Sequence, residues 1–282
     1  MPRSSTIWPN AARAVIGCTP HASGEIYGQN VIPPFNQSPW PVPVAVIAPR
    51  HWHIFEHAVR QGDEIGFCLS GRDDAQARAM NVVGRLERGD RCVIVSTPQN
   101  GWFRCAGERG ARVALLVALA RWASVAGPKR NFLFLSNFGH EIGHMGIHHL
   151  FERDVLPPPE STDLWLHLGS SIGTVGYDED KTLLRPNGPD KDSWLFSSQD
   201  LIAHLQQSFS DLPHLEPALY DRNHGEIRWI LERGYSDMAP MGLQKFFHLA
   251  GDGPEVVDPH LLGKVFAAIC RTIETFEPTL EP

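Results

Sequence analysis

The chain lacks the features that mark several large classes of protein. No apolar run in its 282 residues approaches the roughly 18 residues that a membrane-spanning helix requires. A formal charge of −7 argues against the concentrated basic face of a nucleic-acid binder. The N-terminal residues contain no signal-peptide apolar core, which predicts a cytoplasmic protein. We therefore expect neither nucleic acid nor a membrane as a partner.

Cysteine and the common nucleophile and phosphate motifs are also scarce. The five cysteines are scattered and form no CxxC pair, which argues against a disulfide scaffold and against a thiolate zinc site. The sequences GxSxG, GxGxxG and the Walker loop do not occur. Cys105, in a loop near two arginines, stays open as a nucleophile. The residue in excess is histidine, with 14 copies that can bind metal or carry protons near neutral pH.

The order of predicted elements is that of an α/β fold. Residues 92–96 and 132–136 are apolar runs typical of strands buried on both faces, and residues 111–126 favour a helix between them. Strand, helix and strand in this order predict a right-handed crossover in a mostly parallel central sheet flanked by helices. Further elements are expected as a strand at 164–168, a polar surface excursion at 178–193, a helix at 201–209, a strand at 242–248 and a closing helix at 256–275.

The first part of the chain differs in composition. It is rich in proline, and its short regular elements are expected as strands at 14–16, 42–47 and 65–69 and a helix at 56–61. We therefore expect two domains, a small β-rich unit over residues 1–78 and an α/β domain over residues 79–282.

Three loops expected at one edge of the sheet carry residues that can bind metal or transfer protons. Ligands of open α/β sheets bind beyond the carboxyl ends of the strands, where such loops meet. Glu108 precedes the apolar helix, Glu141 follows the second strand, and His248 ends the late strand. Each alone is equally well explained as an ordinary polar residue, such as a carboxylate at a helix start. Together, two carboxylates and one imidazole suffice for a single zinc ion with an open position for water.

Residues 140–144 also spell HExxH, which binds zinc when both histidines share one face of a helix. The context argues against that reading. His140 directly follows a buried strand, where a loop is expected, and Gly143 weakens any helix. Ile147 stands where the longer metalloprotease motif needs glycine. We interpret His140 as a proton carrier beside Glu141.

Several segments are similar in order and pattern to one enzyme family. They are a first strand at 81–86, a strand and acidic turn at 132–146, a Ser-Asp pair at 236–237 and an HxxxD segment at 248–252. Together they cover most of residues 81–275 and resemble the zinc aminopeptidases, a family that includes bacterial leucyl aminopeptidases, glutamate carboxypeptidase, the transferrin receptor and glutaminyl cyclase. Residues 1–78, through 42–46 and 58–62, resemble the protease-associated (PA) insert of many members.

The resemblance implies a metal site with altered ligands. The family's first metal-binding histidine and its accompanying aspartate fall at Thr97 and Gln99, and a later metal-binding aspartate falls at Gly169. A two-zinc site would therefore lose ligands. The surviving positions resemble the one-zinc pattern of glutaminyl cyclase and are Glu108, Glu141 and His248.

These observations predict a hydrolase-type enzyme acting on a small amide, ester or peptide-like substrate. One zinc ion would lie on the three surviving ligands, and His140, at the family's general-base position, would transfer the proton. Arg104 or Arg109 would hold a substrate carboxylate, with His167 beside it. An enzyme with no metal, working through its histidines and glutamate, is an equally open alternative, and a non-catalytic relative is a third. The sequence leaves open the substrate's identity and whether the chain forms a homo-oligomer.

Overall fold

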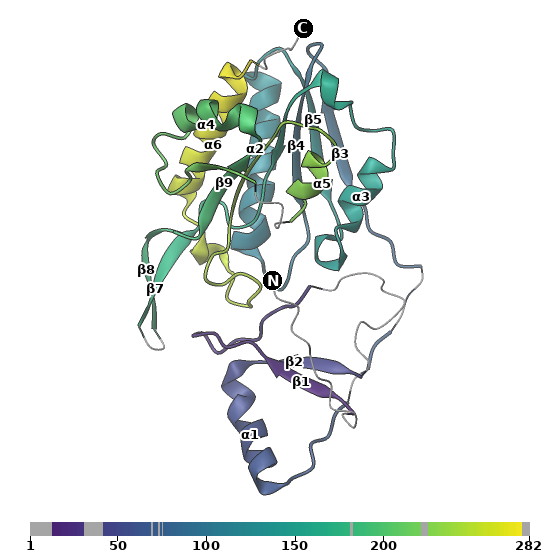
Figure 1. Ribbon diagram of the computed structural model, residues 1–282, viewed down its shortest axis with the longest axis vertical. Helices are drawn as coiled ribbons and strands as arrows, with labels where there is room; N and C mark the ends of the chain where they lie inside the picture. Colours follow the sequence, from purple (N-terminus) through teal and green to yellow (C-terminus); the bar gives the residue numbers. More distant parts are fainter. Residues whose placement is uncertain are drawn as a thin grey trace.

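The computed structural model describes residues 13–30, 42–68, 70–72, 74, 76–180, 183–220 and 225–277. Its main body is a seven-stranded sheet with helices on both faces (Figure 1). The strands of this sheet are β3 (Val82–Leu86), β4 (Cys92–Pro98), β5 (Asn131–Asn137), β6 (Thr162–His167), β9 (Ser193–Ser197), β10 (Pro217–Leu219) and β11 (Asp237–Gly242). The helices around it are α2 (Ala111–Val125), α3 (Met145–Phe151), α4 (Ile202–Ser208), α5 (Ile227–Leu231) and α6 (Pro259–Thr275).

Strand directions place several loops at one edge. The strand order is β10-β9-β11-β6-β4-β5-β3. Strand β4 runs parallel to both β5 and β6, and β6 runs parallel to β11. The antiparallel pairs are β3 with β5 and β9 with β11. The expected mostly parallel sheet is confirmed, and the carboxyl ends of β4, β5, β6 and β11 share one edge.

Alternate residues of the central strands pack into two cores. Val93 and Val95 of β4 lie in the core that α2, α4 and α6 cover, with Leu119 of α2. Ile94 points to the other face, into the core that α3 and α5 cover, with Ile147 of α3. Because both faces of β4 are buried, its sequence is a continuous apolar run. Each such side chain contributes roughly 1.5–3 kcal/mol through burial.

The structure corrects one predicted strand and adds others. The late strand ends at Gly242, so the expected strand at 242–248 is wrong, and the residues after Gly242 form turns. Pairing explains the shift, because residues 237–242 lie between β6 and β9 and bond to both. Strands β9 and β10 were not predicted. The expected surface excursion contains a hairpin, β7 (Val175–Asp180) and β8 (Leu183–Pro189).

The N-terminal segment is small. It contains a parallel pair, β1 (Val15–Cys18) with β2 (Val44–Ile47), and helix α1 (Trp52–Gln61). Residues 65–68 of the expected third strand have no regular structure, and residue 69 lies outside the described residues. The division near residue 78 and the PA-like identity of this segment stay predictions. Among the helices of the described ranges, none has the length and apolar character to cross a membrane.

Candidate functional site

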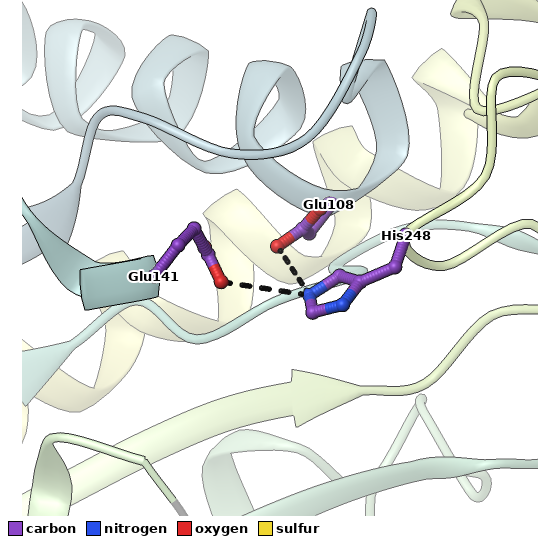
Figure 2. A group of neighbouring side chains, drawn as sticks. All are labelled: Glu108, Glu141 and His248. Atoms are coloured by element: carbon purple, nitrogen blue, oxygen red, sulfur yellow. Dashed lines mark ion pairs between the residues drawn. The ribbon is translucent and has the colours of Figure 1, made fainter. Parts of the chain in front are cut away.

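The three residues expected to converge do so. Glu108 lies in η2 (Ala106–Gly110), the helical turn after β4, Glu141 lies in η3 (His140–Ile142), which follows β5, and His248 lies beyond β11. One potential ligand atom from each residue lies within 4.8 Å of those of the other two, and all three side chains are buried. Figure 2 shows them pointing toward one another from three separate segments. The His248 Nε2 atom is 3.3 Å from Glu108 Oε1 and 3.7 Å from Glu141 Oε2. We call these three residues the Glu-Glu-His cluster.

Backbone contacts fix the positions of Glu108 and His248. The amides of Gly107 and Glu108 donate to the carboxylate of Asp252, at 2.7 and 2.9 Å. A Cβ at Gly107 would lie 2.6 Å from Val256, so only glycine permits this approach. His248 has a φ of 61°, a strained value that its surroundings must enforce. Its Nδ1 lies 3.0 Å from the Gly28 carbonyl oxygen. A carbonyl only accepts, so Nδ1 carries the proton and Nε2 faces the glutamates.

Arg109 lies against both carboxylates of this cluster. Its Nη2 forms an ion pair with Glu108 Oε1 at 2.7 Å and donates a hydrogen bond to Glu141 Oε1. The arginine side chain is buried with them. Burial raises the pKa of Glu141 above its ordinary value, and the neighbouring Arg109 opposes that rise. Arg109, expected to hold a substrate carboxylate, is therefore already the counterion of two protein carboxylates.

The Glu-Glu-His cluster fits a metal in part. Zn–O and Zn–N bonds of about 2.0–2.2 Å put the ligand atoms of one tetrahedral ion roughly 3.4 Å apart, close to the two distances from His248. Among the described residues, Glu108 Oε2 and Glu141 Oε2 accept no hydrogen bond, and Glu108 Oε1 has the ion pair with Arg109 but no hydrogen bond of good geometry. The charge does not fit, because Arg109 already places a positive group on both carboxylates. As arranged, the residues accommodate a divalent ion only if the guanidinium moves.

A second group of polar side chains surrounds His140. The His140 Nδ1 atom is 2.9 Å from Glu226 Oε1, and Glu226 is fully buried. The side-chain amide of Asn137, the last residue of β5, donates to both Glu226 oxygens, at 2.9 and 3.0 Å. The His144 ring lies 4.7 Å from that of His140, and its Nδ1 accepts from the Trp229 indole. Glu226 therefore orients His140, as a carboxylate orients the imidazole of a catalytic pair.

The HExxH and Cys105 readings find no support in this geometry. In the described part of the chain, His140 and His144 belong to no group of three or more potential metal ligands, whereas the residues of the Glu-Glu-His cluster form one. Burial raises the pKa of Cys105 to about 11, which disfavours a nucleophilic thiolate. Thr97 and Gln99, which stand where the family has metal ligands, form hydrogen bonds to the backbone. The Thr97 hydroxyl donates to the Leu168 carbonyl, and the Gln99 side-chain amide donates to the Met80 carbonyl.

A cavity of about 190 Å³ opens beside the cluster and is lined by His140. Its polar wall also contains Arg109, Arg112, His167 and Glu226, and its apolar wall contains Ile227, Met241, Leu243 and Phe247. Pockets for drug-sized ligands measure roughly 300–1,000 Å³, so this one suits a small molecule. Glu108, Glu141 and His248 do not line it. Arg104 is exposed and lies outside it as well.

Burial keeps the cavity's histidines neutral. Desolvation, with help from Arg109 and His144, lowers the pKa of His140 well below its ordinary value. Desolvation also lowers the pKa of His167 to about 4. Burial raises the pKa of Glu226, while His167, His144 and the Asn137 hydrogen bonds oppose that rise. His140 is therefore neutral at physiological pH and has a nitrogen free to accept a proton, but its lowered pKa makes it a weaker base than an ordinary imidazole.

Glu226 and Arg112 are the site residues that sequence reasoning missed. Glu226 follows a glycine just before the short helix α5, a position that carries no motif. Arg112 stands near the start of an apolar helical run, and a charged residue at that position is the signal that the sequence offers.

Comparison with known proteins supports the fold. Neither a scan against protein-family models nor a search of curated proteins finds a match. A zinc aminopeptidase from Bacillus subtilis matches with a TM-score of 0.55 and 14% identity, over 68% of this chain and 48% of that chain. A glutaminyl cyclase from an Acidobacteriales bacterium matches with 0.52 and 14%, over 68% and 72%. A Zn-dependent exopeptidase from Parabacteroides distasonis matches with 0.52 and 12%, over 70% and 77%.

The resemblance stated from the sequence is thereby confirmed for the fold. The chain has the α/β architecture of zinc aminopeptidases and glutaminyl cyclases. It spans about half the length of the Bacillus subtilis aminopeptidase. Identities this low establish a shared fold and leave activity to be argued from the site.

Proposed function

We propose that this chain is a hydrolase-type enzyme that cleaves a small amide, ester or peptide-like substrate in the 190 Å³ cavity. The observation that supports this proposal is the His140–Glu226 pair on the cavity wall. A buried carboxylate bonded to one imidazole nitrogen fixes the ring and stabilises the positive charge that it gains on protonation. His140 Nδ1 is bonded to Glu226, so Nε2 is the nitrogen left to meet water or substrate.

The reaction then follows general acid–base chemistry. His140 Nε2 takes a proton from a water molecule as the water oxygen attacks the substrate carbonyl carbon. The C–N or C–O bond breaks, and His140 returns that proton to the leaving amine or alcohol. The carbonyl oxygen gains negative charge before the bond breaks. Arg109 lines the cavity, but Glu108 and Glu141 already neutralise its guanidinium, so we assign it no part in stabilising that oxygen.

A metal-dependent version is the second candidate. The donor types and the two distances from His248 favour it, and Arg109 opposes it. Glu108, Glu141 and His248 would hold the ion, and Arg109 would have to release both carboxylates. A divalent ion, when bound, polarises a carbonyl group and lowers the pKa of bound water. The two candidates use the same histidine and differ in their need for metal.

A substrate screen with matched variants tests the proposal. Small N-acyl amino acids, dipeptides and esters are incubated with the protein, with and without EDTA, while elemental analysis measures bound metal. We expect turnover that EDTA leaves unchanged and that His140→Gln lowers by about 10²-fold or more. His149→Gln is the control, because His149 is an exposed histidine on α3.

The outcomes distinguish the metal-independent enzyme, the metal-dependent enzyme and the non-catalytic protein. Turnover that EDTA abolishes, together with stoichiometric zinc, would establish the metal-dependent version. Equal loss of activity in both histidine variants would refute the role of His140. Ligand binding without turnover of any substrate would favour the non-catalytic alternative.

A further inference from the structure

Arg112 is a buried arginine that has no acidic partner among the residues that the structure describes. It lies on α2, four residues after Glu108, and its side chain is 1% exposed. Its Nη1 donates to the Leu168 carbonyl at 3.2 Å. Its Nε and Nη2 have no hydrogen-bond partner among the described residues, and no ion pair of Arg112 occurs there. Arg112 also lines the 190 Å³ cavity that contains His140.

The two unpartnered nitrogens form one edge of the guanidinium. Nε–H and the neighbouring Nη2–H point the same way, and this edge binds both oxygens of a carboxylate in parallel hydrogen bonds. The third nitrogen, Nη1, is held by the Leu168 carbonyl, which fixes the plane of the group. The part of the side chain that recognises a planar anion is therefore unpaired among the described residues, and because both nitrogens are shielded from solvent, a ligand must displace neighbouring side chains to reach them.

Arg109 differs from Arg112 because its charge is neutralised by carboxylates of the same chain. Three residues earlier, in η2, Arg109 contacts two protein carboxylates and a backbone carbonyl. A buried charge without a partner destabilises a folded protein, and such charges are usually paired. Within the described residues, nothing in the chain pairs with Arg112. An anionic ligand from outside the chain would neutralise the charge of Arg112.

We propose that Arg112 binds a carboxylate of the substrate, so that the cavity takes small acidic molecules. The apolar residues Met241, Leu243 and Phe247 line the same cavity and suit a short apolar group on the same molecule. The substrate class is then an acylated amino acid or a related amide with one free carboxylate. Assignment as a substrate rests on the proposed hydrolase function, whereas binding of the carboxylate does not. The role expected for Arg104 or Arg109 from the sequence falls instead to Arg112.

Matched pairs of ligands test the charge requirement directly. The probes are N-acetylglycine, N-acetyl-L-alanine and N-acetyl-L-leucine, each compared with its neutral carboxamide by calorimetric or NMR titration. We expect at least one acid to bind about 10- to 100-fold more tightly than its amide, as bidentate charged hydrogen bonds allow. Inorganic phosphate is titrated as a second anion, and we expect it to bind more weakly.

Variants assign that preference to Arg112. Arg112→Met should remove the preference for the acids and leave the thermal midpoint no lower than that of the wild type, because it removes an unpaired buried charge. Arg112→Lys keeps the charge without the fork, should bind the acids more weakly, and serves if the methionine variant fails to fold. Arg121→Met, an exposed arginine on the same helix, should behave as the wild type.

The proposal fails if no acid is preferred over its amide, if the preference survives in Arg112→Met and Arg112→Lys, or if phosphate binds and no carboxylate does. His140→Gln separates this inference from the proposed function. It should abolish turnover while leaving carboxylate binding intact. If the wild type binds the carboxylate but turns over no substrate, the hydrolase proposal is refuted and the carboxylate site at Arg112 is supported.

Discussion

Arg109→Met is the substitution that tests most about this site. The guanidinium lies between the side chains of Glu108 and Glu141, and all three residues are buried. Methionine keeps much of the arginine's apolar stem and removes its charge. The variant therefore leaves two buried carboxylates without their cation, while the packing around the stem changes little.

The size of the effect follows from burial. The side chains of Glu108 and Glu141 are 0% and 6% exposed, so water does little to stabilise either charge. Removing one partner of a buried ion pair destabilises a protein by about 3–5 kcal/mol. At about 2–4 °C per kcal/mol, the melting temperature should fall by about 6–20 °C. Arg112→Met is the matched control on the same helix, and its melting temperature should not fall.

Calorimetry with and without zinc measures both roles of Arg109. If the guanidinium keeps metal out, zinc should stabilise Arg109→Met and have little effect on the wild type. Stabilisation of about 2.7 kcal/mol is expected when zinc is present at 100 times its dissociation constant. A melting temperature within 2 °C or so of the wild type would refute the view that Arg109 is the counterion of both glutamates. Equal zinc stabilisation of both proteins would refute the competition.

Three further substitutions probe other buried groups. Glu226→Gln should lower kcat by about 10²-fold with little change in KM, because Glu226 orients His140 and touches no substrate; steady-state kinetics on a substrate from the screen decides this. The pKa of His167 is about 4 in the folded protein and 6.5 in the unfolded chain, so the unfolded chain binds the proton first as the pH drops. The free energy of unfolding of the wild type should therefore fall by about 3 kcal/mol between pH 6.5 and pH 4. Chemical denaturation should show a smaller fall for His167→Asn. Burial raises the pKa of Asp237 well above its ordinary value, so the unfolded chain loses this proton first and the stability of the wild type falls as the pH rises. Asp237→Asn has no such proton to lose. Its melting temperature relative to that of the wild type should therefore increase from pH 5 to pH 8.

Local patterns in the chain were enough for the central strands β4, β5 and β6 and for helix α2. The apolar run of β4 is visible in the sequence because this strand is buried over its full length, and the glycine-terminated run of α2 is visible because it is apolar even at exposed positions such as Val117 and Val125. The late strand was misplaced because β11 is defined by its pairing with β6 and β9, and β9 lies about 40 residues earlier in the chain. Pairing across such a separation leaves no local periodicity to detect.

The site divides in the same way. The rule that ligands bind beyond the carboxyl ends of parallel strands brought Glu108, Glu141 and His248 together from sequence alone. Glu108 and Glu141 follow strands that the sequence showed correctly, whereas the strand before His248 lies at 237–242 and not at the expected 242–248. The neighbours of these residues could not be predicted. Arg109 in η2 faces the glutamates, whereas Arg112 in α2 has no acidic partner in the described part of the chain, and this difference depends on side-chain direction. The pairing of His140 with Glu226 joins residues 86 positions apart. Sequence therefore determined which chemical groups reach this edge of the sheet. Only the tertiary structure decided which charges neutralise each other and which are left for a ligand, because that depends on distances of a few ångströms between segments far apart in the chain.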